Sequence, residues 1–140
     1  MRPVAAALAA LCLTTASAVA ASDLTAYEGK YPSDAVDGIT FLANPAVVAG
    51  VAATLSDEGL RATVLGEETV QSPITVKDGV VRADDCEPHN CGDHNWSILV
   101  DAASGATDVC YHDASAMGQD ESRWYLASGE TEMRPGTCFE

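Results

Sequence analysis

One short segment holds the residues whose types and spacing could do chemistry. Residues 84–94 are Asp-Asp-Cys-Glu-Pro-His-Asn-Cys-Gly-Asp-His, so two cysteines and two histidines lie within nine positions. Such residues suit three kinds of chemistry: zinc binding, nucleophilic attack by a cysteine–histidine pair, and closure of a loop by a disulfide. The compartment in which the chain works helps to decide among them.

The beginning of the chain predicts export. Arg2 supplies a positive start, residues 4–13 are almost wholly apolar, and small residues then lead to Ala-Val-Ala at 18–20, an Ala-x-Ala cleavage site. We therefore predict a secretory signal over residues 1–20 and a mature single domain over residues 21–140.

Two other interpretations of this start are disfavoured. The apolar run is shorter than the roughly 20 residues that a membrane span needs. A lipoprotein anchor at Cys12 is disfavoured because bulky Leu11 precedes it, where lipoprotein signals have a small residue. Cleavage would remove Cys12 and leave four cysteines, which are Cys86, Cys91, Cys110 and Cys138. In an oxidising compartment four cysteines indicate two disulfides, with three connectivities open.

The charge of the mature chain excludes some partners. Loss of Arg2 would leave 6 of the 7 basic side chains against 21 acidic ones, a net charge of −15. Such a surface repels nucleic acid and anionic lipid and attracts basic proteins, although solubility alone would also explain it. About 120 residues suffice for one modest core.

A bond between Cys86 and Cys91 would close a six-residue ring. It would remove roughly 2 kcal/mol of loop entropy from the unfolded chain. Pro88 fixes one backbone angle in this ring, and Gly92 can supply an unusual exit conformation. Because so small a ring cannot bury its backbone, we expect His89 at the tip of a rigid protrusion, where it would bind a partner with little loss of entropy.

The other two chemistries fit less well. A zinc site would have to use Cys86, His89, Cys91 and His94, but structural zinc sites usually separate the cysteine pair from the histidine pair. A cysteine held in a disulfide cannot act as a nucleophile. We therefore expect a binding protein rather than an enzyme, with no metal and no cofactor, and we interpret His94 and His112 as ordinary hydrogen-bonding residues near strand ends.

Two helices are predicted in the first half of the mature chain. Asn44 followed by Pro45 marks a helix start, because asparagine caps and proline suits the first helical position. We expect helices over residues 45–55 and 57–65, after an irregular lead-in over residues 23–38.

The second half has the pattern of β-strands. They are expected over residues 70–76, 80–83, 96–102, 106–112 and 122–127, with Lys-Asp-Gly at 77–79 forming a hairpin turn. In the third of these strands Trp96, Ile98 and Val100 share one face. Helices followed by hairpins predict an α+β domain with an antiparallel sheet of about five strands. Trp96, Trp124 and Tyr125 are expected to pack in the core or across strands.

The segment Cys86-Glu87-Pro88-His89-Asn90-Cys91 resembles the Cys-x-Pro-His-x-Cys loop of the Ivy family, which are periplasmic inhibitors of vertebrate lysozyme in Gram-negative bacteria. The resemblance implies a sheet with helices packed on one side and a disulfide-closed loop that enters the active-site cleft of a C-type lysozyme. His89 would contact the catalytic carboxylates there. It also implies a periplasmic protein without a membrane anchor.

Two features depart from the family pattern. Glu87 and Asn90 stand where the typical loop has lysine and aspartate, and Cys110 and Cys138 form an additional pair. The alternative is an Ivy-like periplasmic binding protein without lysozyme inhibition, which would control another partner such as an endogenous lytic transglycosylase. A homodimer is compatible with either function. From the short ring and from closure of the tail, we predict that Cys86 pairs with Cys91. Cys110 would then tie Cys138, and with it the C-terminal tail, to the sheet.

Overall fold

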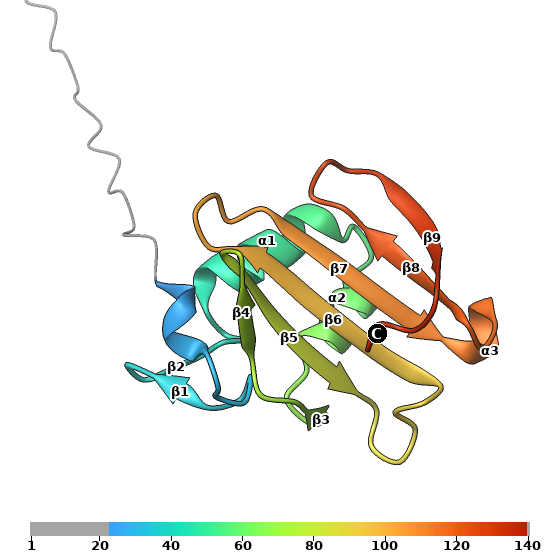
Figure 1. Ribbon diagram of the computed structural model, residues 1–140, viewed down its shortest axis with the longest axis horizontal. Coiled ribbons are helices and arrows are strands. Elements are labelled where there is room, and N and C mark those ends of the chain that lie inside the picture. Colours follow the sequence, from blue (N-terminus) through green and yellow to red (C-terminus); the bar gives the residue numbers. More distant parts are fainter. Residues whose placement is uncertain (1–22, 140) are drawn as a thin grey trace, which may run out of the picture.

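The computed structural model describes residues 23–139, so the predicted signal over residues 1–20 lies outside the described residues. In chain order the elements are η1 (Leu24–Tyr27), β1 (Ala35–Val36), β2 (Ile39–Thr40), α1 (Pro45–Thr54), α2 (Glu58–Val64), β3 (Val70–Gln71), β4 (Thr75–Lys77), β5 (Val80–Cys86), β6 (His94–Asp101), β7 (Thr107–Asp113), α3 (Ala114–Met117), β8 (Glu121–Tyr125) and β9 (Thr131–Pro135). Strands β3 to β9 form one antiparallel sheet, and α1 and α2 pack on one of its faces (Figure 1). The α+β prediction is confirmed.

Both predicted helices are present, with bounds within two residues of those expected. Asn44 caps α1 by accepting a hydrogen bond from the Ala46 N–H at 3.0 Å, and Pro45 occupies the first turn. Asp57 caps α2 in the same way through the Leu60 N–H at 2.8 Å. The packing of α1 on β7 is close, because a Cβ on Gly50 would lie 2.1 Å from the Thr107 hydroxyl oxygen.

Strands β5, β6 and β7 form the centre of the sheet and carry its core. Trp96, Ile98 and Val100 of β6 are buried on the face that the helices cover, as the alternating pattern predicted. The turn between β4 and β5 is the predicted Asp-Gly hairpin, with positive φ at Asp78 (52°) and Gly79 (80°). These three strands hold the 86–94 segment at one end of the sheet.

The first predicted strand is interrupted. The structure divides residues 70–76 between β3 and β4, because Pro73 has no N–H to donate. Ile74 instead pairs with the lead-in: its N–H donates to the Lys30 carbonyl at 2.8 Å, and its own carbonyl accepts from the Gly29 N–H at 2.8 Å. Its side chain is thereby buried in the core.

Over residues 23–139 the sheet has seven strands rather than about five. Besides the division of the first strand, the sequence prediction missed β9, whose residues are mostly exposed and lack an alternating apolar pattern. It also missed the β1–β2 hairpin and η1, which lie at or near the segment predicted to be irregular. Short or polar elements give little periodic signal.

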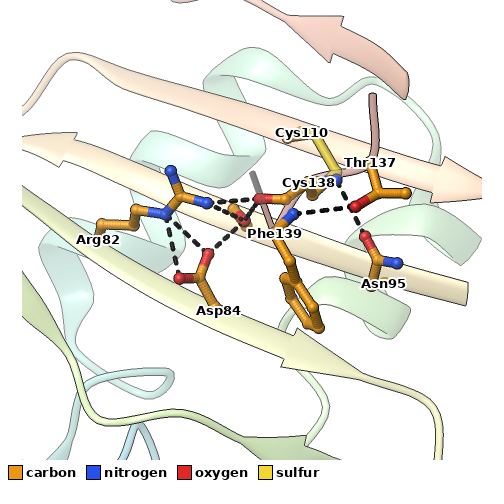
Figure 2. Close-up of polar contacts among 8 residues, drawn as sticks. Arg82, Asp84, Asn95, Cys110, Thr137, Cys138 and Phe139 are labelled. Atoms are coloured by element: carbon orange, nitrogen blue, oxygen red, sulfur yellow. Dashed lines mark hydrogen bonds and ion pairs between the residues drawn. A yellow bond between two sulfur atoms is a disulfide. The ribbon is translucent and has the colours of Figure 1, made fainter. Parts of the chain in front are cut away.

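The sheet face opposite the helices is partly covered by residues 136–139, which we call the C-terminal strap. A disulfide joins Cys138 of the strap to Cys110 of β7. The Cys138 carbonyl accepts hydrogen bonds from the Arg82 guanidinium and, at 3.0 Å, from the Ser97 hydroxyl (Figure 2). Because the strap covers it, Ser97 is fully buried although it lies on the outward face of β6.

Candidate functional site

The candidate site is the loop between β5 and β6, which projects beyond the ends of both strands (Figure 1). The structure contains a disulfide between Cys86 and Cys91, which closes the six-residue ring. Cys86 is the last residue of β5 and is buried, whereas the four residues between the two cysteines are exposed. His89 is therefore carried on a ring whose base is fixed in the sheet.

Backbone hydrogen bonds brace this loop independently of the disulfide. The Glu87 N–H donates to the His94 carbonyl at 3.1 Å, which continues the β5–β6 pairing beyond Cys86. The Asn90 N–H donates to the Glu87 carbonyl at 3.0 Å, and the His94 N–H donates to the Asn90 carbonyl at 2.8 Å. The loop is thus a sequence of tight turns in which most amides are already satisfied, so little order needs to be gained when a partner binds.

His89 has a backbone conformation that few side chains favour. Its φ of 65° lies in the left-handed region, which histidine enters more readily than alanine or a β-branched residue does. The ring thereby turns back on itself at its most exposed point. Any test of the His89 side chain must separate the loss of the imidazole from strain in the backbone.

The two residues that depart from the family pattern are bonded to each other. The Asn90 side-chain amide donates to the Glu87 carboxylate at 2.7 Å across the ring. The same carboxylate oxygen lies 3.1 Å from His94 Nδ1, and His94 Nε2 lies 2.9 Å from the Tyr111 hydroxyl. A chain of four side chains therefore runs from the exposed ring to β7.

The protonation states in this chain follow from its ends. Bonds from Asn90 and then His94 lower the pKa of the Glu87 carboxyl, so Glu87 is ionised at neutral pH and can only accept. His94 Nδ1 must then carry a hydrogen, so it donates to Glu87, while Nε2 contacts the Tyr111 hydroxyl. Burial, with Asp113 nearby, raises the pKa of Tyr111 and keeps that hydroxyl protonated.

An open pocket of about 370 Å³ lies beside the loop, between it and α3. Three carboxylates, those of Glu87, Asp93 and Asp113, contribute to its lining. The pKa of Asp113 is lowered, chiefly by the Ser115 hydroxyl that donates to it at 2.6 Å, so it is ionised at neutral pH. The base of the loop is therefore acidic, in agreement with the charge of the chain.

The structure places the histidines in different environments. His89 is exposed at the loop, and His94 supports the loop from below. His112 is fully buried, with Nδ1 2.6 Å from the Glu121 carbonyl. Sequence reasoning did not single out Tyr111 or the link from Glu87 to His94. The only available signal was the seven-residue spacing across a hairpin, which does not specify a contact.

Neither alternative chemistry has support at this loop. The disulfide leaves Cys86 and Cys91 without a thiolate for zinc or for nucleophilic attack. Within residues 23–139 no group of three or more histidine, cysteine, aspartate or glutamate side chains is arranged to hold a metal ion. Over the same residues no helix is long and apolar enough to cross a membrane.

A braced, disulfide-closed loop with four exposed residues suits binding to a partner, because little conformational freedom remains to be lost. The family model described as inhibitor of vertebrate lysozyme (Ivy) matches residues 46–129, from α1 to just beyond β8. The chain therefore belongs to the Ivy family, which is a family of lysozyme inhibitors and not of enzymes. No curated protein and no solved structure matches the chain.

Proposed function

We propose that this protein inhibits a C-type lysozyme in the periplasm of a Gram-negative bacterium by inserting the Cys86–Cys91 ring into the active-site cleft. Family membership supports inhibition of a lysozyme-type partner. The observation that carries the loop mechanism is the exposed His89 on a ring held by a disulfide and by a continuous set of hydrogen bonds. The predicted signal supports export.

His89 suits the chemistry of such a cleft. A retaining glycosidase holds one protonated and one ionised carboxyl group about 5 Å apart. A neutral imidazole has one N–H donor and one acceptor nitrogen, so it can donate to the carboxylate and accept from the carboxylic acid. A protonated imidazole would add charge attraction to the ionised group. Either form occupies the position that substrate needs.

Glu87 favours a second candidate partner. Its carboxylate is half exposed beside the tip, where it would approach the acidic centre of a lysozyme. Its contact with His94 Nδ1, at 3.1 Å, holds the charge toward the base of the loop, which reduces but does not remove this repulsion. A related periplasmic muramidase with a less acidic cleft, such as a lytic transglycosylase, is therefore the alternative partner.

Replacement of His89 tests the proposal. His89→Gly removes the imidazole and tolerates the positive φ, so folding should be preserved. We expect it to weaken inhibition of a C-type lysozyme by about 2 to 4 kcal/mol, because two desolvated carboxyl groups lose their bridge. His89→Asn tolerates the same backbone and keeps a donor and an acceptor, so it should recover part of the loss. The measurements are inhibition constants and melting temperatures.

Asp78 provides the matched control. It has a φ of 52° in an exposed turn between β4 and β5, so Asp78→Gly makes the same exchange for glycine at a similar backbone conformation without involving the loop. Inhibition by Asp78→Gly should equal that of the parent. If His89→Gly inhibits as well as the parent, the loop mechanism is wrong. If the parent does not inhibit C-type lysozyme but does inhibit a lytic transglycosylase, the alternative partner is correct.

A further inference from the structure

One buried side chain joins the candidate loop to the C-terminal strap. Asn95 lies on β6 opposite Cys86 and is 1% exposed. Its Nδ2 donates to the Cys91 carbonyl at 2.8 Å, and its Oδ1 accepts the Cys138 N–H at 3.1 Å. A single amide thus satisfies a backbone acceptor in the loop and a backbone donor in the strap. Figure 2 shows the strap end of this link.

The strap is anchored without help from Asn95. The Cys110–Cys138 disulfide attaches it to β7, and Arg82 and Ser97 hold the Cys138 carbonyl. Arg82 is itself fixed by the Asp84 carboxylate at 2.8 Å. The Cys138 N–H therefore has a fixed position, and its hydrogen bond to Asn95 Oδ1 sets the orientation of the Asn95 amide.

The loop depends on that orientation at its closing residue. Cys91 is held by its disulfide to Cys86 on one side and by Asn95 on the other. If the strap is released, Asn95 Oδ1 loses its partner and the side chain gains rotational freedom. The Cys91 carbonyl then loses a fixed donor even though the ring disulfide is intact, and the turn from Asn90 to His94 loosens.

We propose that Asn95 is a positioning residue for the loop, and that the Cys110–Cys138 disulfide fixes the position of the loop through it. The strap lies outside residues 46–129, which match the family model, so this support is a feature of the present chain beyond the matched region. The coupling is a property of the chain alone, and its effect on inhibition rests on the proposed function of the loop.

Amide hydrogen exchange measured by NMR tests the coupling without a partner. The amides to follow are those of Asn90 and His94 in the loop, with Ile98 and Val109 as core references. The test uses two variants, the double variant Cys110→Ser/Cys138→Ser and the single variant Asn95→Ala. In each, the exchange rates of the loop amides should rise over the parent about tenfold more than those of the core amides do. Combining all three substitutions should add nothing further, because both changes interrupt the same link. Additive effects, or unchanged loop exchange, would overturn the proposal.

A milder pair of variants keeps the test decisive if Asn95→Ala does not fold. Asn95→Asp retains an acceptor for the Cys138 N–H and replaces the donor to Cys91, so the loop should loosen while the Cys138 amide stays protected. Ser97→Ala removes one strap contact without touching the loop and serves as the matched control. If Ser97→Ala loosens the loop as much as Asn95→Asp does, Asn95 is not the link.

Inhibition constants against a C-type lysozyme separate this proposal from the previous one. The strap-disulfide variant and Asn95→Asp should inhibit about tenfold more weakly than the parent, with Ser97→Ala near the parent. If the parent does not inhibit, the proposed function fails while hydrogen exchange still decides the coupling. If the loop loosens and inhibition is unchanged, Asn95 has no positioning role and the proposed function stands.

Discussion

Asp85 is the residue whose chemistry differs most from that of an ordinary surface carboxylate. It is fully buried on β5 next to the loop, with Oδ1 accepting from the Thr69 hydroxyl at 3.0 Å. Its Oδ2 has no hydrogen-bond partner among the residues that the structure describes. Burial, opposed by the Thr69 bond and assisted by the neighbouring Asp84 charge, raises its pKa from 3.8 to about 7.

This pKa predicts a stability change between pH 4 and 7. The folded state keeps the proton on Asp85 over this range while the unfolded state releases it, so the free energy of unfolding falls as pH rises and levels off above about 7. The contribution is on the order of 4 kcal/mol, since the pKa rises from 3.8 to about 7 and one pKa unit corresponds to about 1.4 kcal/mol.

Asp85→Asn should remove this contribution, and its stability should exceed that of the parent increasingly from pH 4 to 7. Denaturant unfolding at several pH values measures the difference. Asp120→Asn, at an exposed carboxylate, is the control and should run parallel to the parent. Parallel curves for Asp85→Asn and the parent would contradict the assignment.

Predictions for single residues succeeded where the backbone conformation depends only on neighbouring residues in the sequence. The Asn44–Pro45 helix start and the Asp78–Gly79 turn depend on backbone preferences of a few neighbouring residues, so they were predictable. The link from Asn95 to Cys138 joins residues 43 positions apart, and no local preference signals it. Ser97 is buried because the same strap covers it, so its burial could not be predicted from local sequence either.

At the scale of the element, the loop has two supports besides the Asn95 link to the strap. One support is the ring disulfide, and the other is the side-chain brace from Glu87 through His94 to Tyr111. Because the pKa of Glu87 is lowered, the stability that its carboxylate contributes is present at neutral pH and is lost only as pH falls through that lowered pKa. The brace therefore holds across neutral and mildly acidic conditions.

Substitution of Glu87 distinguishes its charge from its hydrogen bonds. Glu87→Ala releases Asn90 and His94, so inhibition should weaken about tenfold. Glu87→Gln keeps an acceptor oxygen and removes a charge that would face the acidic cleft in the proposed complex, so it should inhibit at least as well as the parent. Inhibition constants for the two variants and the parent separate the effect of the charge from that of the hydrogen bonds.

Glu68→Gln makes the same charge change at an exposed position outside the loop and should leave inhibition unaltered. Equal inhibition by Glu87→Ala and the parent would show that the brace does not support binding.

The elements themselves were predictable in proportion to their length and periodicity. The long strands β6 and β7 and the capped helices have clear patterns, and the structure contains them nearly as predicted. Strand β9 is held by pairing with β8 and by Arg134, which stacks over the Trp124 ring at 4.2 Å. Its own residues are mostly exposed and give no apolar pattern, so the strand could be recognised only from its pairing with β8 in the structure.

At the scale of the whole molecule, charge should govern how fast the inhibitor finds its partner. The mature chain would have 6 basic and 21 acidic side chains, a net charge of −15, and acidic groups also surround the loop. Attraction to a basic lysozyme raises the association rate by about 10- to 1,000-fold at low salt, and ions screen it beyond about 8 Å at physiological ionic strength.

We therefore expect the association rate constant with a basic lysozyme to fall at least tenfold from low to high salt, with little change in dissociation. Stopped-flow or surface-based kinetics over a salt series measure both. His89→Gly should show the same salt dependence of association, because one side chain contributes little to the long-range field of a chain with a net charge of −15. An association rate that does not depend on salt would mean that the acidic surface serves solubility alone.

The positions of the two disulfides along the chain also bear on biosynthesis. The cysteines of the ring are 5 residues apart and those of the strap are 28 apart, and Cys138 follows every strand in the sequence. A chain exported as the signal predicts would emerge N-terminus first, so the ring could be oxidised while β7 to β9 are still absent. The strap bond could form only after β7 to β9 have crossed. Molecules that stall earlier would carry a closed ring without the strap.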